Sequence, residues 1–152
     1  VRTEGEREYV DVNEMLQRSL ALVRYECGGV ENVVRLDPSL PPVLAVPVRL
    51  LQVFSNLILN AYQAMDGAGS LTVSSRRGEG GVVVSVEDSG PGIPPDLLAS
   101  VFTPFFTTKP ADKGTGLGLY ITRDIVRDMG GDIRVESRPG RTLFEVLLPA
   151  GE

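Results

Sequence analysis

The 152-residue chain contains no histidine and only one cysteine. The absence of histidine excludes histidine-based acid–base catalysis and histidine metal ligands within this chain. The single cysteine, Cys27, has no partner for an internal disulfide, which favours a reducing compartment. We therefore expect a cytoplasmic location for this domain, which is compatible with a membrane anchor elsewhere in a longer parent protein.

Long apolar runs and basic runs are also missing. The longest apolar stretches, Val43–Val48 and Val82–Val86, have the length of strands and fall well short of the ~18 residues that a membrane span needs. The net charge is −5, so a nucleic-acid partner is not expected, and we expect no direct membrane contact by this domain. With 42% hydrophobic and 23% charged residues, the composition is that of an ordinary globular domain.

The pattern of apolar residues, glycines and prolines predicts an α+β fold. The expected helices are one that is N-capped by Asn13 and ends at Gly28-Gly29, then Pro47–Met65, a short one at Pro95–Ser100, and about Leu117–Met129. The expected strands are Tyr9–Val12, Val30–Leu36, Leu71–Arg77, Val82–Glu87, Asp132–Glu136 and Thr142–Leu148. Since strands and helices do not alternate strictly, we predict a two-layer α/β sandwich, with a mixed sheet of about five strands covered on one face by three main helices.

Residues 1–9 are charged and show no periodicity, whereas residues 10–152 carry the pattern of a folded domain. We interpret the first segment as a linker or the tail of a preceding helix. The chain begins with Val1 rather than methionine, so we expect it to be part of a longer protein.

The helix Pro47–Met65 carries an unusual polar face. Four neutral amides recur at spacings of four, four and three residues: Gln52, Asn56, Asn60 and Gln63. A solvated face is the common explanation for such a stripe, but it usually carries Glu, Lys and Arg, and asparagine is a poor helix former. Amide oxygens can ligate Mg²⁺ and amide NH₂ groups can donate to phosphate, which favours a binding face.

Two glycine-containing segments point to a nucleotide. The sequence DSGPGI, Asp88 to Ile93, follows a predicted strand; it is also compatible with a plain turn. Its two glycines allow a flat ligand to approach the backbone, and the carboxylate can accept a hydrogen bond from an amine such as that of adenine. The sequence GTGLGLYI, Gly114 to Ile121, runs into a helix whose N-terminal N–H groups can bind phosphate. Neither a P-loop nor a dinucleotide fingerprint matches it.

Between these segments lies VFTPFFTTK, Val101 to Lys109. Its three phenylalanines are compatible with simple core residues. Their position beside the polar, glycine-containing stretch Pro110–Gly114 favours an anchor for a lid over a nucleotide.

Together the four blocks resemble, in order, the N, G1, F and G2 boxes of sensor histidine kinases, a family of the Bergerat-fold superfamily. NLILNAYQAM resembles the N box, DSGPGI the G1 box, FTPFFTTK the F box and GTGLGL the G2 box, while RTLFEVLLP resembles the closing strand. The likeness runs from about Val10 to Pro149 and covers nearly the whole chain.

The resemblance implies roles for the matching positions. Asn60 would ligate Mg²⁺ and serve catalysis together with Lys109, a phosphate contact, while Asp88 would bind the adenine amine and Pro110–Thr115 would form the lid. The ATP-binding positions that it implies are Asn56, Asn60, Gln63, Asp88, Gly90, Gly92, Ile93, Gly114, Thr115, Gly116, Leu117, Gly118, Leu119 and Thr142.

Three positions depart from the family pattern. Gln63 stands where many relatives have a lysine, so one positive charge near the phosphates is missing. Val46 occupies an N-cap position that is often aspartate, and Arg141 stands where glycine is usual, which puts the strand geometry before Thr142 in question.

The function that the resemblance implies is transfer of the γ-phosphate of Mg²⁺-ATP to a histidine on a separate dimerisation domain, with a response regulator as the indirect partner. Residues 1–9 would then be the tail of that domain. Related ATPases carry a catalytic glutamate where this chain has Asn56, which favours transfer to a protein over hydrolysis. The alternatives are an ATP-sensing module that transfers nothing and a serine kinase of the anti-sigma-factor type.

Overall fold

A computed structural model describes residues 5–104 and 118–151 of the chain. In chain order its elements are β1 Glu8–Val10, α1 Val12–Leu22, the 3₁₀ helix η1 Arg24–Glu26, β2 Glu31–Arg35, β3 Val43–Ala45, α2 Pro47–Met65, β4 Ser70–Gly78, β5 Gly81–Asp88, α3 Pro95–Leu98, α4 Gly118–Asp128, β6 Asp132–Arg138 and β7 Arg141–Pro149.

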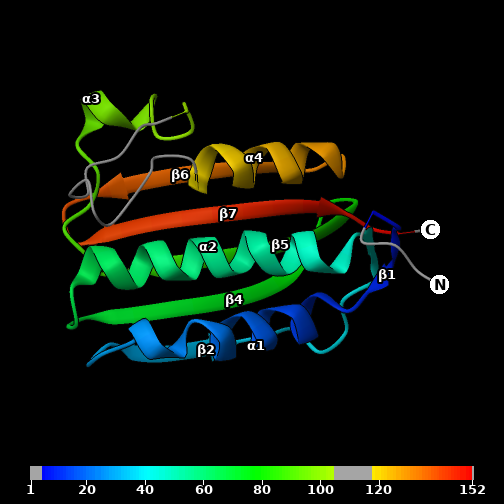
Figure 1. The fold of residues 1–152 in the computed structure, drawn as a ribbon, viewed down its shortest axis with the longest axis horizontal. Coiled ribbons are helices and arrows are strands. Elements are labelled where there is room, and N and C mark those ends of the chain that lie inside the picture. The colour runs from blue at the N-terminus through cyan, green and yellow to red at the C-terminus, as the bar shows by residue number, and fades with distance from the viewer. Residues whose placement is uncertain (1–4, 105–117, 152) are drawn as a thin grey trace.

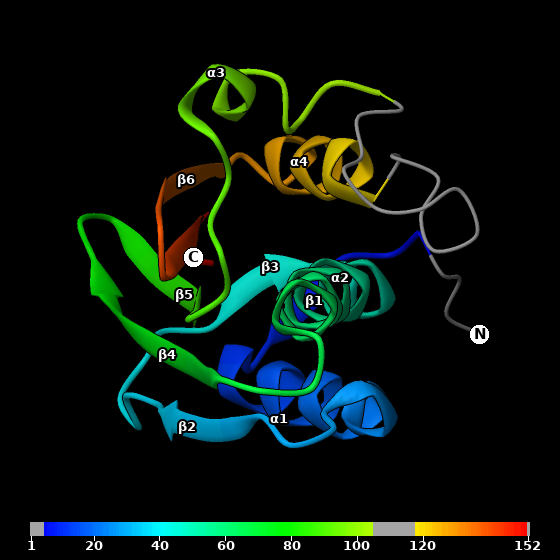
Figure 2. The same ribbon diagram turned by 90° about the vertical axis from the view of Figure 1, so that its left-hand side faces the viewer.

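Five strands form one mixed sheet in the order β2-β4-β5-β7-β6. The β2–β4 pair is parallel and the other three pairs are antiparallel. Helices α1, α2 and α4 cover one face of this sheet, with α2 between the other two (Figures 1 and 2). The α+β class and the two-layer architecture predicted from the sequence are confirmed.

Helix α2 is the central helix of this layer and begins and ends where the sequence predicts. Pro47 occupies its first turn, and Val46 before it provides no side-chain cap, as its departure from the family pattern suggests. The helix ends at Asp66, which adopts a left-handed conformation with φ 50°. Its buried side chains are Leu50, Val53, Phe54, Leu57, Ile58, Ala61, Tyr62 and Met65. Burying each of the larger ones contributes roughly 1.5–3 kcal/mol, so α2 is the main support of the core.

The start of α1 differs from the prediction. Its N-cap is Asp11, whose carboxylate accepts a hydrogen bond from the backbone N–H of Glu14 at 3.2 Å. Asn13, the predicted cap, lies inside the helix, and its amide donates to the carbonyl of Asp37 at 2.7 Å and accepts from the hydroxyl of Ser75 at 2.7 Å. Local propensity favours Asn13 as the cap, but its side chain instead makes tertiary hydrogen bonds.

A second, two-stranded sheet lies beside the main one. β1 pairs antiparallel with β3, with Tyr9 opposite Leu44. The sequence predicts a strand at Tyr9–Val12, which overlaps β1, but it predicts neither β3 nor this pairing, and Glu8 of the leading segment also belongs to the sheet. β3 leads directly into α2, so the N-terminal segment is attached to the base of the central helix. Within the described ranges, no helix combines the length and apolar character that crossing a membrane requires.

Candidate functional site

Five elements meet at one end of the sheet. β5, β6 and α2 end there, while β7 and α4 begin there (Figure 1). Asp88 is the last residue of β5, Thr142 is the second residue of β7, and Gly118 is the first residue of α4. The topology thus brings the end of the N box, the start of the G1 box, the last part of the G2 box and the closing strand to the same end of the molecule.

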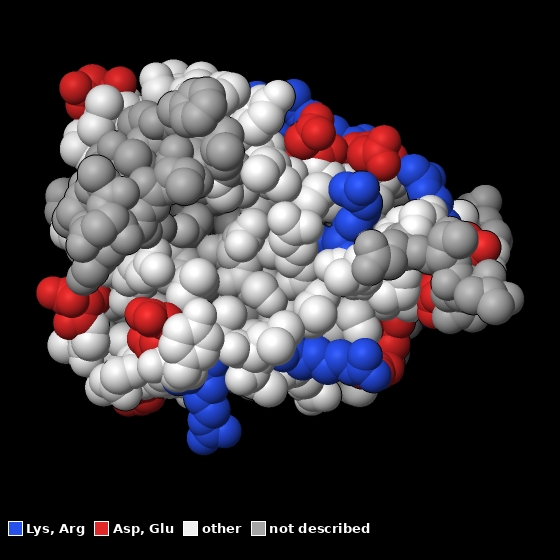
Figure 3. All heavy atoms as spheres, viewed as in Figure 1, with Lys and Arg blue, Asp and Glu red and all other residues white. Residues whose placement is uncertain are grey.

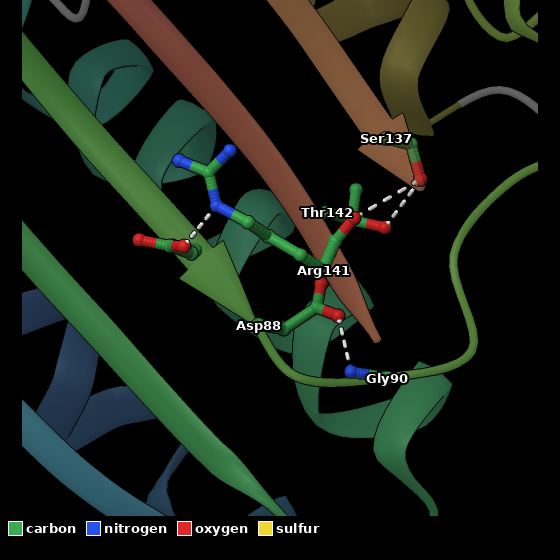
Figure 4. A network of polar contacts seen from close by, with 6 residues as sticks. Asp88, Gly90, Ser137, Arg141 and Thr142 are labelled. Atoms are coloured by element: carbon green, nitrogen blue, oxygen red, sulfur yellow. Dashed lines mark hydrogen bonds and ion pairs between the residues drawn. The ribbon is translucent and has the colours of Figure 1, made fainter. Parts of the chain in front are cut away.

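Asp88 is a buried carboxylate at this end, with only 6% of its surface exposed. Its Oδ1 accepts a hydrogen bond from the backbone N–H of Gly90 at 2.9 Å (Figure 4). Desolvation by burial raises the pKa of this carboxyl above its usual value, the neighbouring Glu87 raises it further, and the Gly90 N–H opposes the shift. A buried carboxylate of this kind gains from a hydrogen-bond donor that a ligand brings to it.

The two glycines of the loop after β5 are required by close approaches. At Gly92, φ is +87° and a Cβ would lie 2.4 Å from the carbonyl oxygen of Arg138. At Gly90, a Cβ would lie 2.9 Å from Oδ1 of Asp88. A side chain at Gly92 would push the loop away from the sheet end, and one at Gly90 would displace the Asp88 carboxylate, so both glycines keep the loop close to the ends of β5 and β6.

Asp88, Thr142 and Ser137 form a row across β5, β7 and β6. Asp88 is the register partner of Thr142, and Thr142 is in turn the register partner of Ser137. The Oγ atoms of Ser137 and Thr142 lie 2.8 Å apart (Figure 4), and Ser137 Oγ accepts the backbone N–H of Ile93 at 2.7 Å. Sequence reasoning missed Ser137, because a serine within a strand carries no local signal and only the β6–β7 register brings it to the site.

Arg141 begins β7 without disturbing it. β7 pairs in regular register with β6 from Arg141 on and with β5 from Thr142 on. An arginine in place of the usual glycine therefore leaves the strand geometry regular. The guanidinium pairs with the carboxylate of Glu87, the residue before Asp88. Because alternate residues of a strand face opposite sides, this pair lies on the side of the sheet away from Asp88 and Thr142.

The amide face of α2 lies next to α4. Asn56 Nδ2 donates to Thr122 Oγ1 at 3.4 Å, and Thr122 Oγ1 donates to the carbonyl of Gly118 at 2.7 Å. Asn56, Asn60 and Gln63 are half-buried, whereas Gln52, one turn earlier, is exposed. The middle of the helix-covered face is largely uncharged in Figure 3, with charged side chains gathered toward its margins.

The first part of the predicted lid anchor is buried. Phe102 is 8% exposed, packs edge-on against Phe144 with ring centroids 6.2 Å apart, and lies 5.1 Å from the Arg123 guanidinium. Gly118 and Leu119, half-buried at the start of α4, are also described. The other predicted positions of these blocks lie outside the described residues: Lys109, the lid Pro110–Thr115, Gly114, Thr115, Gly116 and Leu117.

The donor set around α2 fits Mg²⁺ that arrives with a nucleotide. In the part of the chain that the structure describes, no three Asp, Glu, Cys or His side chains gather into a metal-binding cluster. Mg²⁺ in nucleotide sites is usually held by one or two protein oxygens together with phosphates and water. The half-buried amide of Asn60 offers one such oxygen.

Comparison with known proteins places the chain among sensor kinases. Residues 45–152 match the family model described as histidine kinase-, DNA gyrase B-, and HSP90-like ATPase. The chain is 43% identical over 143 residues to the sensor histidine kinase ZraS of Escherichia coli K12, covering 92% of the chain and 30% of ZraS. It is 39% identical over 154 residues to the sensory histidine kinase/phosphatase NtrB of Rhodobacter capsulatus, covering 92% of the chain and 43% of NtrB.

Solved structures give the same result. The catalytic domain of histidine kinase ThkA superposes with a TM-score of 0.83 at 35% identity, with 95% of each chain covered. Full-length ShkA in complex with AMPPNP superposes with a TM-score of 0.81 at 30% identity, covering all of this chain and 33% of ShkA. The chain thus spans less than half the length of ZraS, NtrB and ShkA. It belongs to the family of histidine kinase-, DNA gyrase B- and HSP90-like ATPases, as an ATP-binding catalytic domain of the sensor histidine kinase type.

Proposed function

We propose that this domain binds Mg²⁺-ATP between α2 and α4 and donates the γ-phosphate to a histidine on a separate dimerisation domain. The observation that carries the proposal is the meeting of a neutral amide face, a helix N-terminus and a buried carboxylate at one end of the sheet. These three features are complementary to the metal, the phosphates and the base of one nucleotide.

Adenine is assigned to the sheet end beside Asp88. Because Oδ1 is engaged by the Gly90 N–H, Oδ2 is the oxygen that we assign to the exocyclic amine. Gly90 and Gly92 let the loop lie close to Asp88 and the end of β6, Ile93 lies at the loop end, and Thr142 is the register partner of Asp88.

The phosphates are assigned to the space between Asn60 and the start of α4. The N–H groups of the first turn of α4 and the positive end of its helix dipole, at Gly118 and Leu119, favour phosphate there, and Asn56 lies alongside. Asn60 would hold the Mg²⁺ that neutralises phosphate charge. Catalysis by this domain then consists of positioning and charge neutralisation.

Transfer to protein is favoured over hydrolysis by the residue types present. Asn56, at the position where related ATPases carry a glutamate, has an amide that cannot act as a general base toward water. The chain contains no histidine, so the acceptor has to lie outside it. We propose that residues 1–9 connect the two domains, that a response regulator receives the phosphate afterwards, and that the domain works in the cytoplasm.

The test uses this chain, γ-labelled ATP, Mg²⁺ and the histidine-containing helical domain of its parent protein. The proposal predicts label on the helical domain that is stable in base and lost in acid, and no label when the acceptor histidine is replaced by alanine. Acid-stable label on serine would contradict it in favour of a serine kinase. ATP binding with no transfer would contradict it in favour of a sensing module.

A further inference from the structure

Ser137 is the one member of the polar row at the sheet end that has no assigned role. It is half-buried near the end of β6 and contacts both the start of β7 and the loop after β5, which lies far away in sequence. Its Oγ lies 2.8 Å from Thr142 Oγ1 and 3.4 Å from the carbonyl of Arg141 (Figure 4), and it accepts the N–H of Ile93 at 2.7 Å. The side chain therefore joins the loop after β5 to the strand that carries Thr142.

The Ser137 and Thr142 hydroxyls lie 2.8 Å apart, so either can donate to the other, and the carbonyl of Arg141 at 3.4 Å is a second acceptor for Ser137. When the Thr142 hydrogen is donated to a ligand, Ser137 can donate to Thr142 Oγ1 while accepting from Ile93. In that arrangement the hydrogen of Thr142 points away from Ser137.

Asp88, the register partner of Thr142, lies on the other side of Thr142 from Ser137, on the same face of the sheet. A ligand at this point meets a carboxylate that accepts and a hydroxyl that donates. The edge of adenine offers an amine that donates beside a ring nitrogen that accepts, which is the complementary pattern. Hypoxanthine has a carbonyl acceptor beside an N–H donor, which is the opposite pattern.

We propose that Ser137 is a specificity-determining positioning residue: by donating to Thr142 and holding the loop at Ile93, it directs the Thr142 hydroxyl hydrogen toward the base and so selects adenine. The inference rests on the proposed function, because it requires the base to bind beside Asp88. Ser137 itself acts through Thr142 and does not need to touch the nucleotide.

The experiment measures the affinities of the 152-residue chain for Mg²⁺-ATP and for inosine triphosphate by calorimetry. In Ser137→Ala, ATP affinity should fall roughly 3- to 10-fold, the effect of one hydrogen bond, while inosine triphosphate affinity changes less than about twofold. Ser137→Thr keeps the hydroxyl and should keep the preference for ATP. Ser74→Ala removes a half-buried hydroxyl from β4, on the opposite face of the sheet, and should match the original chain.

A double-mutant cycle separates this role from a general loss of structure. If Ser137 acts through Thr142, then Ser137→Ala should cost little further ATP preference in a Thr142→Val background. Equal weakening of both nucleotides in Ser137→Ala, or additive losses in the cycle, would overturn the inference. If Ser137→Ala folds poorly, the Ser137→Thr and Thr142→Val variants still test the same pair of hydroxyls.

Asp88→Asn tests the adenine assignment separately from the role of Ser137. If it leaves ATP affinity unchanged, the adenine assignment fails and this inference fails with it. If it weakens ATP while Ser137→Ala leaves the base preference intact, the adenine assignment stands and the role of Ser137 alone is refuted.

Discussion

The two flanks of helix α2 differ in how their polar side chains are hydrogen-bonded. On the side of α1 and β2, polar side chains are hydrogen-bonded to one another or to the backbone in short networks. Ser19 of α1 donates to the carbonyl of Met15 at 2.8 Å, and Tyr62 of α2 donates to Asn32 at 2.8 Å. Asn32 in turn donates to the sulfur of Cys27 at 3.2 Å. On this flank the hydrogen bonds stabilise the fold.

The flank toward α4 is built differently. There Asn56 makes a long contact of 3.4 Å to Thr122, and half-buried amides follow along the helix. One side of the helix thus stabilises the domain, and we propose that the other presents amides to a ligand. The comparison predicts that substitutions on the two flanks separate stability from nucleotide chemistry.

The largest effect is expected from Asn60→Ala on the ligand flank. Removing the amide oxygen assigned to Mg²⁺ should lower phosphotransfer by about 100-fold or more, the usual scale for losing one group that stabilises charge in phosphoryl transfer. Some nucleotide affinity should remain because the base pocket is intact. Gln52→Ala, an exposed amide on the same helix, is the control in the transfer assay. Transfer that survived Asn60→Ala would move the metal role elsewhere.

A smaller effect is expected from Asp88→Asn at the end of β5. The change removes a charged hydrogen bond worth ~1.5–3 kcal/mol, so ATP affinity should fall roughly 10- to 150-fold. The same change removes a buried charge whose pKa burial has raised, so the free energy of unfolding should stay equal or increase. Calorimetry and urea denaturation measure the two quantities. A parallel loss of stability and affinity would indicate a structural role instead.

The pH dependence of Asp88 gives a third test with a defined sign. Since burial raises the folded pKa of Asp88 above its usual value of 3.8, the folded state binds more protons between the two pKa values, and its stability falls as the pH rises through this window. ATP affinity should change in the opposite direction and fall as the carboxylate is protonated. Both dependences should be reduced in Asp88→Asn. Identical pH profiles for the two proteins would rule out this carboxyl as their source.

The smallest effect is expected from Tyr62→Phe on the structural flank. Burial raises the pKa of Tyr62 to about 12, so its hydroxyl is a neutral donor to Asn32 at ordinary pH. Its loss should cost about 0.5–1.5 kcal/mol in the free energy of unfolding and leave ATP affinity unchanged. A change in ATP affinity of tenfold or more would show that the two flanks are not independent.

Local sequence signals predicted the elements that carry their own start and stop residues. Helix α2 begins at Pro47 and ends at Met65 as expected, because proline favours a first turn and Asp66-Gly67 adopts left-handed conformations that end the helix. The β4–β5 hairpin was found for the same reason. Its turn contains Gly80 with φ +77°, between two strands of alternating pattern.

Features that depend on distant partners were not predictable in this way. β3 is three residues long and exists as a strand only because β1 pairs with it, more than thirty residues away. Asn13 and Asp11 are both good capping residues, and contacts with Asp37 and Ser75 decide which one caps α1. The roles proposed for Asp88 and Asn60 come from residue types and motifs in the sequence, whereas finding Ser137 required the register of three strands.

A crystal structure of this chain with ATP and Mg²⁺ tests the central claim most directly. The account predicts the adenine amine within hydrogen-bonding distance of the Asp88 carboxylate and the Asn60 amide oxygen bound to the metal. A nucleotide bound elsewhere, or one whose metal lies away from α2 and whose base lies away from β5, would contradict it.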